Sequence, residues 1–113
     1  MLKKQNRIGT KEVERIFKNA KSRHSKNFLI KEARGDDLSI KKFAVSVPKK
    51  IVKGAVKRNL FRRFIYKKIG DALPKIPGGT SAIIILKKGA VGEERGALLA
   101  ELENLLCEKP RRF

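Results

Sequence analysis

The residues best suited to chemistry lie in one basic segment, residues 47–69, in the middle of the chain. From residue 38 to residue 70 the sequence holds eleven Lys and Arg residues and no Asp or Glu. A guanidinium matches phosphate geometry with two parallel hydrogen bonds, and an Asn amide can both donate and accept. Three arginines and one asparagine recur three or four residues apart, at Arg58, Asn59, Arg62 and Arg63. The segment therefore predicts contacts to the phosphates and sugars of a nucleic acid.

The same segment has the pattern of a helix over residues 55–69. Gly54 ends the preceding loop, and neither Pro nor Gly interrupts the run before Gly70. At about 100° per residue, one side collects polar residues that we expect to face outward. They are Arg58, Asn59, Arg62, Arg63 and Tyr66. The other side collects apolar residues that we expect to pack on a core, namely Val56, Leu60, Phe61 and Phe64.

A run of charge on a helix is often only a solvated face. Solvated faces usually mix signs, however, because like charges four residues apart repel by a few tenths of a kcal/mol. Arg58 with Arg62 and Arg63 with Lys67 are such pairs, and no carboxylate in this segment relieves them. The pattern favours an anionic partner over a solvated face.

Composition places the chain among nucleic-acid binders. It has 113 residues, enough for one domain with a modest core, and 29 basic against 11 acidic residues, with a net charge of +18. A membrane surface would attract the same charge, but the longest apolar run is residues 82–86, too short to span a bilayer. The amino terminus lacks a secretory signal pattern, and Cys107 is the only cysteine. We expect a cytoplasmic protein without a membrane partner, with flexible ends at residues 1–8 and 109–113.

Side chains for independent catalysis are scarce. His24 is the only histidine and lies in a basic loop, where an exposed or phosphate-facing imidazole is expected. Asp36 and Asp37 have the context of turn residues, and Cys107 belongs to an apolar helical stripe. We expect no catalytic residue, no metal site and no intrinsic cofactor in the protein chain.

The first half of the chain predicts one helix and two strands. Thr10 is a suitable N-cap, and Val13 and Phe17 lie on one apolar stripe of a helix that should end near Ala20. Residues 21–27 read as a loop. Residues 28–30 and 43–47 are β-prone, and the turn chemistry between them predicts an antiparallel hairpin.

The second half predicts a strand and a helix after the basic segment. Two prolines and two glycines break the chain at residues 74–79, and residues 82–86 read as a buried central strand. Glu93 and Glu94 open a last helix whose inner stripe is Leu98, Leu102 and Leu105.

These elements predict an α+β fold, a single-domain α-β sandwich over residues 1–113. One small mixed sheet would pack with three helices in the order helix, strand, strand, helix, strand, helix. The strand at 43–47, the basic helix and the strand at 82–86 would form a crossover, which by default is right-handed.

The order of residues in the basic segment resembles the signature of the bacterial ribonuclease P protein subunit. Lys49 and Lys50 form its KK pair, and a short glycine-containing loop follows. Residues 55–59, AVKRN, and the pair at 62–63, RR, complete the pattern. The loop is about one residue longer than in some members, and Tyr66 stands where a further Arg is common. The resemblance is sharp over about residues 43–66 and extends over most of the chain.

The resemblance implies a ribonucleoprotein in which RNA is the catalyst. In that family the RNA subunit, with Mg²⁺ that is bound mainly by RNA, removes the 5′ leader of precursor tRNA by phosphodiester hydrolysis. The protein binds the catalytic RNA and the leader, and no obligate protein partner is expected. The resemblance also implies a left-handed crossover. It assigns binding of the catalytic RNA to Lys50, Lys53, Lys57, Arg58, Asn59, Arg62 and Arg63.

A second surface, for the leader, is implied between the first helix and the sheet. By resemblance Arg7, Val13 and Phe17 contribute to it, with Val13 in place of an aromatic residue. Stacking on one aromatic ring tolerates any base, as a leader of variable sequence requires. From periodicity alone, Phe17 would instead be a core residue.

Two other functions fit parts of the sequence. A small basic ribosomal protein would have the same composition and basic helix, and only the ordered motif argues against it. A metal-dependent nuclease acting alone lacks a convincing set of ligands.

Overall fold

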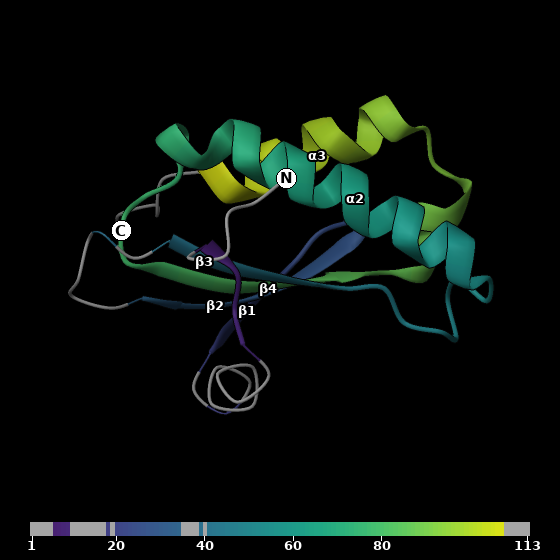
Figure 1. Ribbon diagram of the computed structural model, residues 1–113, viewed down its shortest axis with the longest axis horizontal. Coiled ribbons are helices and arrows are strands. Elements are labelled where there is room, and N and C mark those ends of the chain that lie inside the picture. The colour runs from purple at the N-terminus through teal and green to yellow at the C-terminus, as the bar shows by residue number, and fades with distance from the viewer. Residues whose placement is uncertain (1–5, 10–17, 19, 35–38, 40, 108–113) are drawn as a thin grey trace.

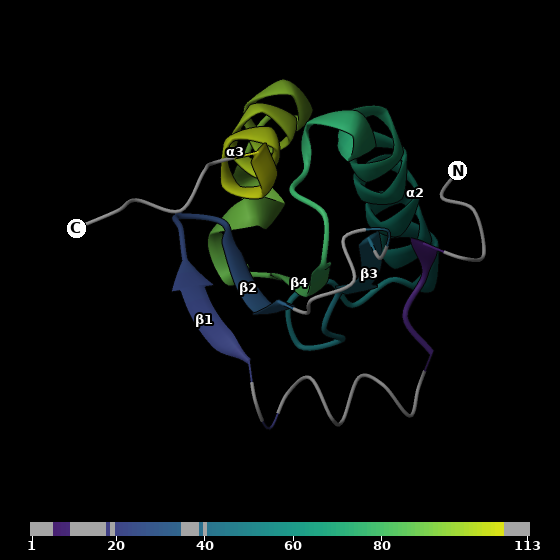
Figure 2. The same ribbon diagram turned by 90° about the vertical axis from the view of Figure 1, so that its left-hand side faces the viewer.

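The part of the chain that the structure describes forms two layers, in which one sheet carries helices α2 (Ala55–Ala72) and α3 (Arg95–Cys107) on the same face (Figures 1 and 2). The computed structural model describes residues 6–9, 18, 20–34, 39 and 41–107. Most of the helix predicted at residues 10–20 lies outside the described residues, as do Val13, Phe17 and the turn residues Asp36 and Asp37.

The sheet has four strands in the spatial order β1-β2-β4-β3. Strand β1 is Lys21–His24, β2 is Phe28–Arg34, β3 is Lys41–Ser46 and β4 is Thr80–Leu86. Strand β2 pairs antiparallel with both β1 and β4, whereas β3 and β4 run parallel. The predicted mixed sheet and the central position of residues 82–86 are confirmed.

Two predictions about the strands were wrong. Residues 21–24 form the edge strand β1 instead of a loop, and β2 and β3 do not form a hairpin because β4 lies between them. Strand β1 has no apolar pattern, since Lys21, Ser22 and His24 are exposed at the sheet edge. Local turn chemistry could not reveal that the isoleucine-rich β4 takes the central place, where β2 and β3 pair with its two edges.

The helices begin close to where the sequence placed them. Helix α2 spans Ala55–Ala72 and η2 spans Leu73–Lys75, while η3 spans Lys88–Gly92 and α3 spans Arg95–Cys107. Helix α2 therefore continues through Gly70, which was expected to end it. The last turn of α2 is retained because Ile69 and Ala72 are buried in the core.

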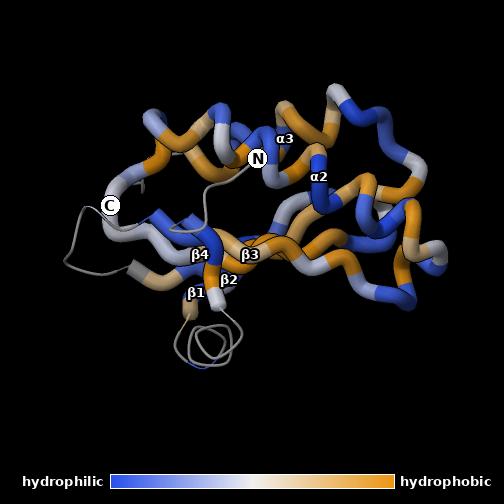
Figure 3. The backbone as a smooth tube through the Cα atoms, viewed as in Figure 1, coloured by the Kyte–Doolittle hydropathy of each residue, from blue (hydrophilic) through white to orange (hydrophobic). Residues whose placement is uncertain are grey.

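The core lies between the sheet and the two helices. Alternate residues of the strands face this layer, including Phe28, Ile30, Phe43, Ala82, Ile84 and Leu86. From the helices, Ile65, Ile69, Leu98 and Leu102 are fully buried against them. The tube in Figure 3 shows hydrophobic residues along the central strands and, at intervals, along both helices. Within the described residues, no helix is both long and apolar enough to cross a membrane.

Candidate nucleic-acid interface

The loop before α2 is fixed by an apolar anchor and a tight turn. Val52 is buried, and the backbone N–H groups of Ile51 and Val52 both donate to the carbonyl of Pro48 over 3.0 Å. The lysines on either side, Lys50 and Lys53, remain exposed. The buried side chain of Val52 thus anchors a short loop whose exposed side chains are cationic.

Arg58 joins this loop to the helix. Its Nη1 donates to the carbonyl of Val52 over 2.9 Å and to the carbonyl of Lys53 over 2.8 Å. Both acceptors are neutral, so the positive charge of the guanidinium is not cancelled. Arg58 therefore fixes the loop geometry and still contributes charge to the surface.

Arg62 and Asn59 form a second contact within α2. The Arg62 Nη1 donates to the Asn59 Oδ1 over 2.9 Å. Because the Oδ1 accepts this bond, the Asn59 amide nitrogen is oriented as a donor. Asn59 and the neighbouring Arg63 are exposed. This arrangement suits a phosphate or sugar oxygen placed over the helix.

The half-burial of two arginines follows from the spacing of α2. Arg58, Arg62, Ile65 and Ile69 lie four, three and four residues apart, which places them on one stripe of a helix. The stripe is apolar and buried in the second half of α2 but cationic in the first half. Arg58 and Arg62 are therefore half-buried at the end of the core, while Arg63 lies on the outer side.

The predicted apolar side of the helix is only partly correct. Phe61 and Phe64 pack against the core, but the Val56 side chain is 83% exposed and that of Leu60 is 47% exposed. Val56 lies nine residues before the buried Ile65, which places it on the opposite side of α2, and Leu60 is its neighbour one turn further along.

Tyr66 also differs from the prediction. We expected its phenol to face outward, but the hydroxyl accepts a hydrogen bond from the backbone N–H of Val45 over 3.1 Å. Tyr66 packs against the core as a half-buried residue. Its role in the described structure is to join α2 to β3.

We define the basic surface as the seven residues that the resemblance assigned to binding of the catalytic RNA. The loop and the first half of α2 bring them together: Lys50, Lys53, Lys57, Arg58, Asn59, Arg62 and Arg63. Among the described residues, none of their six cations forms an ion pair with a carboxylate. The first turn of α2 has no acidic residue, so the positive end of the helix dipole adds to the field.

Three cations outside the predicted set border the basic surface or its helix. Lys49 and Lys67 are exposed, in the loop and on α2 respectively. Arg95 of α3 places its Cζ 5.0 Å from the ring centroid of Phe64, a cation–π contact. The KK pair in the sequence indicated Lys49, and the helical spacing indicated Lys67. No local pattern indicates that Arg95 meets Phe64.

Arg7, predicted for the leader surface, lies beside the outer edge of β3. It forms a parallel bridge with Phe43, and the N–H of the next residue, Ile8, donates to the Phe43 carbonyl over 3.0 Å. The Arg7 side chain is exposed. Its predicted partners Val13 and Phe17 lie outside the described residues, so their proximity to Arg7 stays a prediction.

The sheet face turned away from α2 and α3 carries mixed residues that sequence reasoning did not assign. Strand register aligns Lys31 with Ile83 and Ala44, and it aligns Ser81 with Lys42. These positions alternate with the core positions along each strand. This face therefore combines apolar area with lysine and serine side chains.

The candidate catalytic residues do not converge. His24 is exposed on β1, and Cys107 is half-buried at the end of α3. Burial and the charge of Glu103 raise the pKa of the Cys107 thiol, although Lys75 and Lys68 oppose them. In the described part of the chain, no three His, Cys, Asp or Glu side chains are grouped so that they could hold a metal ion.

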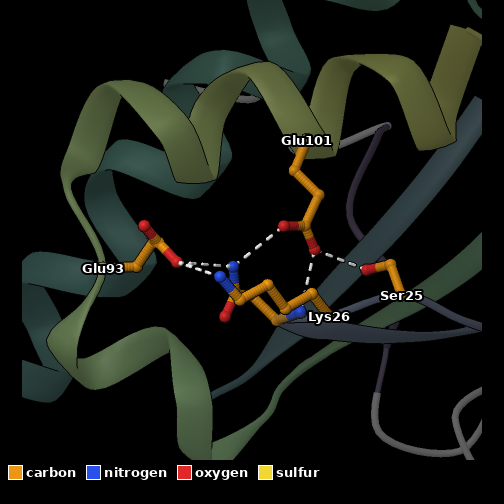
Figure 4. A network of polar contacts seen from close by, with 5 residues as sticks. Ser25, Lys26, Glu93 and Glu101 are labelled. Carbon is orange, nitrogen blue, oxygen red and sulfur yellow. Dashed lines mark hydrogen bonds and ion pairs between the residues drawn. The ribbon is translucent and has the colours of Figure 1, made fainter.

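A half-buried polar network lies away from the basic surface, at the turn between β1 and β2 (Figure 4). Glu101 of α3 accepts hydrogen bonds from the Ser25 hydroxyl over 2.5 Å, the Asn27 N–H over 2.9 Å and the Asn27 amide over 2.8 Å. Burial acts to raise the pKa of the Glu101 carboxyl, but these bonds and the charge of Lys26 outweigh it and lower the pKa. The network attaches α3 to the sheet.

The family model described as Ribonuclease P matches residues 2–109. Over 67 residues the chain is 39% identical to the ribonuclease P protein component of Microcystis aeruginosa, which corresponds to 59% of this chain. That match spans only 56% of the length of the relative.

Two solved structures share the fold. A Staphylococcus aureus RNase P protein mutant with defective mRNA degradation activity is similar with a TM-score of 0.80 and 24% identity, over 89% of this chain and 85% of the other. The RNase P protein from Thermotoga maritima has a TM-score of 0.79 and 22% identity, over 93% of this chain and 98% of the other. The family match covers nearly the whole length, and this chain therefore belongs to the ribonuclease P protein family.

Proposed function

We propose that this chain is the protein component of a ribonuclease P ribonucleoprotein, which removes the 5′ leader from precursor tRNA. In this proposal the protein binds the catalytic RNA through the basic surface. The observation that carries it is the gathering of six cations and one amide on the loop and the first half of α2, with no carboxylate partner among the described residues. Such a surface offers point charges, guanidinium forks and one amide donor to phosphates and sugars.

The bond cleavage is assigned to the RNA. Mg²⁺ held mainly by RNA would supply the activated water and neutralise charge on the cleaved phosphodiester. The protein has a different task, which is to reduce repulsion when two polyanions approach. Cations fixed by a loop, a helix and the Arg58 hydrogen bonds can replace part of the diffuse Mg²⁺ that this approach requires.

We propose the second surface, with Arg7, Val13 and Phe17, as the binding site of the 5′ leader. The exposed Arg7 at the edge of β3 supports it, because a cation there can contact the leader backbone. The lysines and apolar residues on the second face of the sheet add to this support.

A cleavage assay tests the function directly. Precursor tRNA is incubated with protein alone, with the catalytic RNA alone and with both, over a series of Mg²⁺ concentrations. We expect no cleavage by protein alone and a faster reaction with both at low Mg²⁺. Cleavage by protein alone would support an independent nuclease, and no gain over RNA alone would support the ribosomal alternative. The family match favours the ribonuclease P function over both.

Two finer features accompany this proposal. The first is a left-handed β3–α2–β4 crossover, and the path of the chain in Figures 1 and 2 supports it. In Figure 2 the helices lie above the sheet and β3 runs away from the viewer. The chain then returns through α2 above the sheet and enters β4 to the left of β3. The second is a cytoplasmic location, where precursor tRNA is made in bacteria.

A further inference from the structure

Helix α2 carries two large apolar side chains that face outward within the basic surface. Val56 is 83% exposed and Leu60 is 47% exposed. Residues four apart on a helix are neighbours, so the two side chains form one short apolar ridge. The only other exposed large hydrophobic residue in the described part of the chain is Val91 of η3, at 48%.

Charged and polar residues surround this ridge. Asn59 and Arg63 follow Val56 and Leu60 by three residues each, and Lys57 lies beside Val56 in sequence. All three of these residues are exposed. An apolar patch with a polar rim marks an interaction site, and this rim contains cations but no carboxylate. The partner that fits must therefore combine negative charge with apolar surface between the charges.

A-form RNA has this combination. Its minor groove is wide and shallow, and it displays ribose and base edges between two rows of phosphates. A helix with an apolar ridge and flanking cations can contact the sugars and the phosphates at the same time. We propose that Val56 and Leu60 pack against ribose and base edges in the minor groove of the catalytic RNA, between phosphates bound by the flanking cations. This inference rests on the proposed function and adds a contact that does not depend on salt.

The test is binding of the protein to the catalytic RNA over a series of KCl concentrations. The variant Val56→Ser/Leu60→Gln should bind about tenfold more weakly, since the apolar area of two side chains stays in water. The slope of log K against log salt should be unchanged, because no phosphate contact is lost. The apolar variant Val56→Ile/Leu60→Met should keep wild-type affinity. Val91→Ser serves as the matched control and should also keep it.

Three results would overturn the inference: wild-type affinity in the polar double variant, a reduced salt slope in that variant, or an equal loss in Val91→Ser. Sedimentation adds a further arm, since a dimer that the double variant loses, with RNA affinity intact, would assign the ridge to a second copy of the chain. RNA binding and thermal unfolding are measured for each single variant as well as for the double variant. A folding defect caused by one substitution can then be recognised and does not decide the result. These results can be distinguished from a failure of the proposed function. In that case the wild-type protein itself would show no salt-dependent binding to the catalytic RNA.

Discussion

The hydroxyl of Tyr66 on α2 accepts a hydrogen bond from the backbone N–H of Val45 on β3 over 3.1 Å. Strand β4 pairs with one edge of β3, and the N–H of Val45 points to the other edge, where Ile8 also bonds to Phe43. The phenol thus satisfies a strand-edge donor that would otherwise need water. This contact fixes α2 relative to the sheet just after the basic surface ends, and so sets the direction in which the cations face.

Replacing Tyr66 with Phe should therefore change stability more than RNA binding. Loss of one hydrogen bond should lower the free energy of unfolding by about 1 kcal/mol. Urea unfolding measures this difference, and the salt slope of RNA binding should stay at the wild-type value. Weaker binding of the catalytic RNA at every salt concentration in the Tyr66→Phe variant would mean that the phenol contacts RNA after all.

Arg58→Lys tests whether the guanidinium acts by shape as well as by charge. The lysine keeps the charge but cannot reproduce the planar fork that holds the carbonyls of Val52 and Lys53. We expect faster hydrogen exchange at the N–H groups of Ile51 and Val52 and weaker binding of the catalytic RNA. Arg63→Lys is the matched control because Arg63 is exposed, and it should leave both exchange rates unchanged. Wild-type exchange in Arg58→Lys would show that the loop does not need this residue.

The Glu101 network should make stability depend on pH. Hydrogen bonds from Ser25 and Asn27 outweigh the effect of burial and lower the pKa of Glu101 in the folded state. A carboxyl with a lowered folded pKa stabilises the fold above the ordinary glutamate pKa, and this contribution is lost as the pH falls through the folded value. Unfolding measured from neutral to acidic pH should show this loss.

Glu101→Gln removes that titration. At neutral pH the variant should be less stable by about 1.5–3 kcal/mol, since bonds to a charged acceptor are replaced by weaker ones. Its difference from the wild type should shrink as the pH falls below the ordinary glutamate pKa. A difference that stays constant over this pH range would show that the carboxylate charge does not stabilise the fold.

The Cys107 thiol should react slowly in the folded protein. Burial and the neighbouring Glu103 raise its pKa, which leaves less thiolate at neutral pH. We expect alkylation by iodoacetamide to be slower than for a small free thiol and to accelerate in urea. A folded-state rate equal to that of the free thiol would contradict this account.

The sequence predicted well what depends on local pattern. The start of α2 at Ala55, the buried strand at residues 82–86 and the stripe of Leu98 and Leu102 all rest on apolar spacing and on breaks at Gly and Pro. The clustering of cations on one loop and one helix followed from their order in the chain.

What failed depends on neighbours that are distant in sequence. Periodicity groups the residues that share a side of a helix but does not show which side meets the core: Val56 lies nine residues before the buried Ile65, on the opposite side of α2, and it and Leu60 are exposed. Strand β1 is held by pairing with β2 and by the bond from Arg23 to the carbonyl of Leu105, neither of which is visible in its own residues. The contact of Tyr66 with Val45 likewise depends on how α2 lies across β3.

The most direct test of the central claim is the salt dependence of binding between the protein and its catalytic RNA. We predict a steep fall of log K with log salt for the wild type, and a slope smaller by about 0.7–0.9 for each phosphate contact removed by Arg62→Ala or Arg63→Ala. A wild-type slope near zero, or identical slopes in the wild type and both variants, would contradict the claim that the basic surface binds RNA phosphates.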